Sequence, residues 1–272
     1  MITALDHIAL AVTDFAASAD AYEALLGLTA ERLDPDRGAR RAWFRLANMS
    51  LEIIAPSGAG PAGDRVRTRL AQQGEGLLFI AFGVEQEAAA AAARLLDRRG
   101  VPSARAEDAA SSTAILAPEA THGLPMILVQ RKARVPAAPV GEASASLHAL
   151  DHIVVQTPNP DRALALYGAK LGLDLRLDRA NPAWGVRQLF FRCGDSVVEI
   201  GHGLAGGVSD GPDLFGGLAW RTADPEVARA RIAAAGFNVS EVRKGRKPGT
   251  AVFTVRDRTA GVPTLVLSAT ND

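Results

Sequence analysis

Two histidines and two glutamates repeat in type and spacing along this chain of 272 residues. His7 lies within the residues Leu-Asp-His-Ile, and the same four residues surround His152 in the second half of the chain. Each histidine is followed by a glutamate in a strand-like segment, Glu52 in the first half and Glu199 in the second. An imidazole and a carboxylate that share a ligand can act together as acid and base, and both groups bind divalent metal ions. The repeat therefore predicts a polar site in each half.

The segments that carry these residues show the hydrophobic patterns of short strands and amphipathic helices. The predicted elements of the first half are strands over 8–12, 40–46, 50–54, 78–84, 113–116 and 126–130, with helices over 14–27 and 85–99. The second half repeats this order, and its last part has predicted strands over 218–222, 251–255 and 264–267 around a helix over 224–236. The chain is thus predicted to contain four modules of one strand, one helix and three strands.

The domain boundaries follow from composition. A stretch rich in Pro, Ala and Ser separates the two copies and is typical of a linker. We therefore expect a first domain over 1–134, a linker over 135–146 and a second domain over 147–272.

Charge and cysteine content narrow the functional classes. The chain carries 30 basic and 30 acidic residues and has a net charge of zero, which argues against nucleic-acid or membrane-surface partners. Its one cysteine, Cys193, cannot form an internal disulfide, and no signal peptide or membrane-spanning apolar run is evident. These features predict a cytoplasmic protein, and we expect it to be a monomer or a homodimer.

The four-module pattern, with a histidine on a first strand and a glutamate on a last strand, resembles the vicinal oxygen chelate superfamily. That superfamily includes glyoxalase I, extradiol dioxygenases, methylmalonyl-CoA epimerase and the bleomycin- and fosfomycin-resistance proteins, and this chain is most similar to its glyoxalase-like branch. The resemblance covers almost the whole chain outside the linker. It implies an α+β fold in which four βαβββ modules form two tandem glyoxalase-like cups, each with a metal-binding inner face.

Carried over by position, the resemblance implies a set of metal ligands: His7, Glu52, His152 and Glu199. Glu52 and Glu199 would also be the catalytic proton carriers. The second and fourth modules depart from the family pattern and hold other residues at the matching positions: Phe79, Ile127, Gly217 and Leu265. If neighbouring modules pair, each cup receives one histidine and one glutamate, which argues against a ring-cleaving dioxygenase because that chemistry uses two histidines and a carboxylate. An alternative arrangement, with the first module beside the third, would gather all four ligands.

Strand alternation predicts further lining residues. Gln156 and Arg221 are expected to face the second cup, and Phe79 the first, so these three are the predicted substrate-binding residues. Arg221 would bind a carboxylate or phosphate, unless it pairs with Glu199 or lies in water. The glycine-rich segment 201–217 is interpreted as a flap over the second cup.

The leading hypothesis is a glyoxalase-like protein that acts on or binds a small molecule, either carboxylate-bearing or apolar. If the protein is an enzyme, the resemblance implies a lyase or isomerase that transfers a proton next to a carbonyl, with one divalent metal ion (Zn, Ni, Fe or Mn) or without a metal. The alternative is a non-catalytic binding or resistance protein of the bleomycin-resistance type with a degenerate metal site. The retained His–Glu pairs favour chemistry, and the lost ligands favour binding alone.

Overall fold

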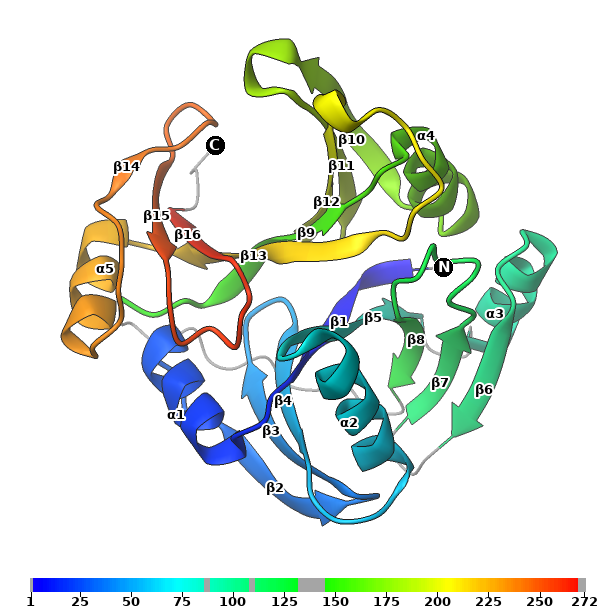
Figure 1. Cartoon of the computed structure of the whole chain (residues 1–272), viewed down its shortest axis with the longest axis horizontal. Coiled ribbons are helices and arrows are strands. Elements are labelled where there is room, and N and C mark those ends of the chain that lie inside the picture. Colours follow the sequence, from blue (N-terminus) through cyan, green and yellow to red (C-terminus); the bar gives the residue numbers. More distant parts are fainter. Residues whose placement is uncertain (1, 86–88, 108–110, 132–144, 269–272) are drawn as a thin grey trace. The chain divides into compact units, whose positions relative to one another are not determined.

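The computed structural model describes residues 2–85, 89–107, 111–131 and 145–268 (Figure 1). The strands of the first copy are β1 (Ile2–Ala11), β2 (Glu31–Asp36), β3 (Ala39–Arg45), β4 (Ser50–Pro56), β5 (Gly76–Val84), β6 (Ser103–Glu107), β7 (Ser111–Leu116) and β8 (Met126–Arg131). Those of the second copy are β9 (Ala149–Gln156), β10 (Asp174–Asn181), β11 (Val186–Cys193), β12 (Ser196–Gly203), β13 (Leu214–Thr222), β14 (Arg243–Lys244), β15 (Ala251–Val255) and β16 (Thr264–Ser268). The helices are α1 (Phe15–Leu26), α2 (Pro61–Gln73), α3 (Ala89–Arg98), α4 (Pro160–Ala163), η1 (Leu164–Lys170), η2 (Pro182–Trp184), η3 (Leu204–Gly206) and α5 (Pro225–Ala234).

Within the described residues, the strands form two eight-stranded sheets of identical order. The first runs β2-β3-β4-β1-β5-β8-β7-β6, and the second runs β10-β11-β12-β9-β13-β16-β15-β14. In both sheets the first strand of one module lies beside the first strand of the next. The matching orders confirm the predicted α+β class and the four strand–helix–strand modules.

Local signals set the ends of two helices as predicted. The Asp14 carboxylate accepts a hydrogen bond from the backbone N–H of Ala17 and caps α1, which ends at Gly27 in the left-handed conformation. Asp224 caps α5 in the same way, with Pro225 in the first turn.

The helix α2 was not predicted from the sequence. Its backbone passes so close to Gly38 that any side chain at Gly63 would collide with the Gly38 carbonyl. Ala62 and Val66 of this helix pack in a small core with Ile54. Tertiary packing of this kind supports a helix whose own sequence carries few apolar residues.

The chain packs as two compact units. The first unit comprises Met1–His7, Phe79–Pro136 and His152–Gly216, and the second comprises Ile8–Leu78, Ala137–Asp151 and Gly217–Asp272. The domain boundaries expected from composition stay predictions. Of the predicted linker, only Ala145 and Ser146 lie within the described residues.

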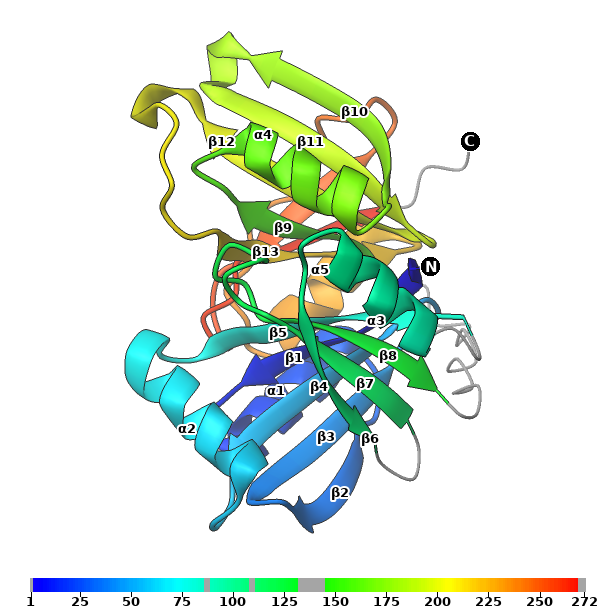
Figure 2. The same ribbon diagram turned by 90° about the vertical axis from the view of Figure 1, so that its right-hand side faces the viewer.

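In the first unit, one face of strands β10–β12 is covered by α4 and η1 (Figure 2). Tyr167 of η1 packs against Phe191 with ring centroids 5.7 Å apart, and Ile153, Val155 and Ile200 are fully buried. Because side chains alternate along a strand, His152 and Glu199 lie on the opposite face. The helices therefore bury the apolar face and leave the polar residues on the other one.

Candidate functional site

His152 and Glu199 lie on adjacent parallel strands of the first unit. In the register of β9 and β12, His152 is paired with Val197 and Glu199 with Val154, which places both side chains on one face. The His152 Nε2 atom is 3.4 Å from Glu199 Oε2, and the side chains are 18% and 14% exposed. The structure thus brings this predicted pair together, close enough to share a ligand or a water molecule. Their catalytic and metal-binding roles stay predictions.

Gln188 of β11 completes the surroundings of Glu199. Its side-chain Nε2 donates a hydrogen bond of 2.6 Å to Glu199 Oε1, and Gln188 is itself buried. A neutral amide orients the carboxylate without cancelling its negative charge. Sequence analysis missed Gln188 because its contact depends on the register between two strands, which no local pattern shows.

Gln156 lies on the same face, and its substrate-binding role stays a prediction. It is paired with Gly201 in the register of β9 and β12. A Cβ atom at Gly201 would be 3.1 Å from Gln156 Oε1, and one at Gly216 would be 3.1 Å from Gln156 Nε2. The two glycines therefore make room for this amide. We call the surface formed by His152, Val154, Gln156, Gln188, Phe190 and Glu199 the His152 face.

The matching glutamate of the first copy has a different neighbour. Glu52 is buried in the second unit, and its Oε1 atom is 3.0 Å from Arg41 Nε. Arg41 occupies the strand position that Gln188 occupies in the second copy, relative to Glu199. The Glu52 carboxylate is thus paired with a guanidinium, whereas the Glu199 carboxylate has a neutral amide at the matching position.

His7 is held by a carboxylate in the first unit. Its Nδ1 atom is 2.6 Å from Asp6 Oδ1, and Arg131 binds the two oxygens of Asp6 at 2.6 and 3.0 Å. The Phe79 ring meets the His7 ring edge-on, with centroids 5.4 Å apart. The substrate-binding role of Phe79 stays a prediction. Burial alone would raise the pKa of Asp6, but the hydrogen bonds and positive charges of His7 and Arg131 lower it from 3.8 to about 2.

Replacing Asp6 with Asn is expected to lower the free energy of unfolding at pH 7 by about 2 kcal/mol. Because the pKa is depressed in the folded state, this stabilisation is present above pH 4 and is lost as the pH falls towards 2. Urea denaturation at pH 7, and in steps from pH 4 to pH 2, measures both effects. The variant should lose less stability across the acidic range than the wild type, and equal losses would contradict this assignment.

Arg221 has a protein partner that sequence analysis did not consider. Its Nε atom is 2.8 Å from Asp151 Oδ2, and both residues belong to the second unit. Binding of a ligand carboxylate by Arg221 stays a prediction.

The donor atoms of the His152 face allow a test of fit to a metal ion. Two ligands at about 2.1 Å from a tetrahedral ion lie roughly 3.4 Å apart, so His152 and Glu199 are spaced like neighbouring ligands. Catalytic metals typically have three protein ligands, whereas no group of three or more His, Cys, Asp or Glu side chains suited to a metal occurs among the described residues. The pair fits a metal only together with a further ligand, and the four-residue ligand set stays a prediction.

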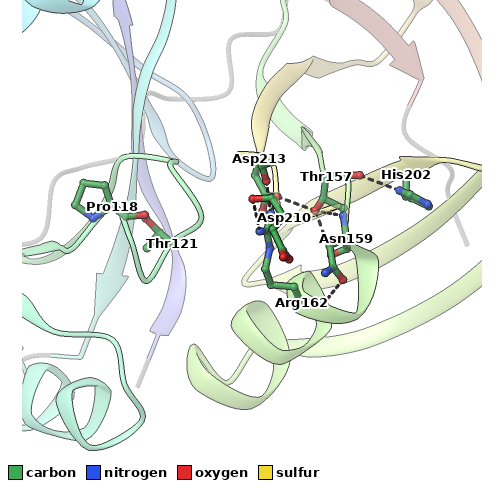
Figure 3. Close-up of polar contacts among 9 residues, drawn as sticks. Pro118, Thr121, Thr157, Asn159, Arg162, His202, Asp210 and Asp213 are labelled. Atoms are coloured by element: carbon green, nitrogen blue, oxygen red, sulfur yellow. Dashed lines mark hydrogen bonds and ion pairs between the residues drawn. The ribbon is translucent and has the colours of Figure 1, made fainter. Parts of the chain in front are cut away.

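A buried ion pair anchors the glycine-rich segment that follows β12. The Asp213 carboxylate accepts hydrogen bonds from Arg162 Nη2 at 2.9 Å and from Thr157 Oγ1 at 2.7 Å (Figure 3). Arg162 also donates to the carbonyl oxygens of Gly211 at 2.7 Å and Asp210 at 3.3 Å. The expected flap is therefore tied down at its C-terminal end, next to the strand that carries Gln156.

None of the helices in the part of the chain that the structure describes is long and apolar enough to cross a membrane.

The chain matches a known protein family once in each of its two copies. A family model described as the Glyoxalase/Bleomycin resistance protein/Dioxygenase superfamily matches residues 6–115 and again residues 151–253. A mutant of 4-hydroxymandelate synthase from Streptomyces coelicolor is similar in structure, with a TM-score of 0.76 and 13% identity over 98% of this chain and 93% of that one. The Mn(II)-bound glyoxalase from Novosphingobium aromaticivorans has a TM-score of 0.70 and 14% identity over 98% of this chain and 82% of that one.

A third similar structure is the 2,2',3-trihydroxybiphenyl 1,2-dioxygenase from Sphingomonas wittichii, with a TM-score of 0.70 and 16% identity over 99% of this chain and 91% of that one. Identities this low show a shared fold alone. No curated protein sequence matches the chain. Because the family model matches two segments that make up most of the chain, the protein belongs to the glyoxalase/bleomycin resistance protein/dioxygenase superfamily.

Proposed function

We propose that the protein binds a small carbonyl compound on the His152 face and transfers a proton next to the carbonyl group, as a lyase or isomerase does. The observation that carries this proposal is the environment of Glu199. One carboxylate oxygen is oriented by the neutral amide of Gln188, and the other lies 3.4 Å from the His152 imidazole. A base and a hydrogen-bonding partner side by side are what general acid–base chemistry requires.

The chemistry follows from these two groups. The Glu199 carboxylate accepts a proton from the carbon next to the carbonyl, and the His152 N–H donates a hydrogen bond to the carbonyl oxygen, which gains negative charge. Return of the proton to the same or another carbon completes an isomerisation without any further reactant. A divalent metal ion, if one is bound with a further ligand, would supply polarisation of that oxygen.

The proposal places the chemistry in the second copy. In the first copy Arg41 neutralises Glu52, whereas Gln188 leaves the charge of Glu199 available. In the first copy the carboxylate is already engaged by an ion pair. A site of that kind can bind a ligand without transferring a proton, which supports the alternative of binding without catalysis.

Cys193 takes no part in the proposed chemistry. Its thiol is buried, and burial raises its pKa to about 12, so it is a poor nucleophile. A free buried thiol supports a location in the reducing cytoplasm as part of the proposal.

Exchange of carbon-bound hydrogen tests the proposal. The wild-type protein is expected to speed deuterium uptake from D₂O at the carbon next to the ketone of 4-oxo-4-phenylbutanoate, measured by proton NMR. Binding of this compound without exchange would favour the non-catalytic alternative and reject proton transfer. Repeating the assay with a chelator and with added Mn²⁺ separates metal-assisted from metal-free chemistry.

A further inference from the structure

Arg179 is an arginine of the second copy that has no carboxylate partner in the described parts of the chain. It lies on β10, paired with Gln188 across the strands, and therefore shares the His152 face. Its Nη2 atom is 3.5 Å from Gln188 Oε1, and its guanidinium carbon is 5.3 Å from the centre of the Trp184 ring. Among the described residues, no carboxylate lies within the 4.0 Å of an ion pair to Arg179, whereas Arg176 and Arg187 nearby both have aspartate partners.

The two copies carry an arginine at different strand positions near the site glutamate. There Leu33 occupies the position of Arg179, and Arg41 occupies the position of Gln188. The first copy thus has its arginine in contact with the glutamate, and the second has its arginine one strand further away, about 4.8 Å in sheet spacing. The positive charge of the second copy is separated from Glu199 by the Gln188 amide and does not neutralise it.

The surroundings of Arg179 suit an amphipathic ligand. Trp184 and Leu177 are 42% and 43% exposed, so both offer apolar surface to a ligand. Leu177 is paired with Phe190 and lies on the same face as Arg179. The Arg179 guanidinium lies over the Trp184 ring, and its planar fork of donors matches a carboxylate.

We infer that Arg179 is the anion-binding residue of the second copy and that the ligand is a small carboxylic acid with an apolar body and a separate carbonyl group. The carboxylate lies at Arg179, the apolar body lies against Trp184, Leu177 and Phe190, and the carbonyl lies at Glu199. The position of the carbonyl rests on the proposed function, but the anion site does not.

Calorimetric titration with two matched compounds tests this inference. The wild-type protein is expected to bind 4-oxo-4-phenylbutanoate about ten- to a hundredfold more tightly than its uncharged primary amide, the range of a charge-assisted fork. Arg179→Ala should weaken binding of the acid by that factor and change binding of the amide less than about twofold. Arg179→Lys should fall between the two, because it keeps the charge and loses the fork.

Arg176→Ala is the matched control. It removes the same charge from the same strand, but Arg176 is paired with Asp174 at 2.8 Å and should leave both affinities unchanged. The inference is overturned if the wild type does not prefer the acid, if neither compound binds, or if Arg176→Ala acts like Arg179→Ala. Circular dichroism of each variant checks that it is folded.

The exchange assay separates this inference from the proposed function. A preference for the acid that depends on Arg179, with no deuterium exchange in the wild type, would support the anion site and reject proton transfer. Exchange by the wild type, with an acid preference that Arg179→Ala leaves intact, would support proton transfer and reject the anion site.

Discussion

Replacing Glu199 with Gln is expected to slow deuterium exchange into 4-oxo-4-phenylbutanoate by about 10²–10⁴-fold, the usual contribution of a general base. The amide has the shape of the carboxylate but cannot accept a proton from carbon. Binding of the compound should change far less than the rate, because Arg179 and the apolar contacts are untouched. Proton NMR gives the exchange rate, and calorimetry gives the affinity.

Glu52→Gln is the matched control, since Glu52 holds the same position in the first copy. Its carboxylate is engaged by Arg41 at 3.0 Å, so the exchange rate per folded molecule is expected to stay within about twofold of the wild type. Equal losses of exchange in the two variants, or a loss in Glu52→Gln alone, would contradict the placement of the chemistry in the second copy.

Replacing Arg162 with Met is expected to lower the stability of the protein strongly. Arg162→Met removes the charged partner of Asp213, whose side chain is fully buried and which would keep only Thr157 as a hydrogen-bond donor among the side chains in Figure 3. Leaving a buried charge without its partner costs about 3–5 kcal/mol. Urea denaturation measures the loss, and the glycine-rich segment should also become more sensitive to proteolysis, because Arg162 holds the carbonyls of Asp210 and Gly211.

Two further variants serve as controls for this loss of stability. Arg176→Ala breaks an ion pair whose side chains are 56% and 62% exposed, and it should cost less than about 1 kcal/mol. The double variant Arg162→Met/Asp213→Leu removes both charges and should be more stable than Arg162→Met alone. A double variant that is no more stable than the single one would show that Asp213 is not an uncompensated charge in the single variant.

The sequence alone determined the duplication, the module order and the shared face of His152, Gln156 and Glu199. Repeats survive in sequence, and the two-residue period of a strand is enough to place His152 and Gln156 on one face. Helix ends could also be predicted from local sequence, because the Asp14 side chain that caps α1 binds a backbone N–H only three residues away. The helix α2 was missed because it starts in a segment rich in Gly and Pro and is supported by packing of a few residues, such as Val66, against a distant core.

Only the tertiary structure decided which partner each charged group has. Whether Glu52 or Glu199 is paired with a cation depends on the residue in the next strand, Arg41 or Gln188, and strand register sets that choice. The pairing of Arg162 with Asp213 also depends on the tertiary structure, because the two residues are 51 positions apart and no sequence pattern links them. Hydrophobic periodicity specifies which face a side chain occupies, but contacts between side chains of neighbouring strands form only when the strands pair, so the chemistry of the site depends on the fold.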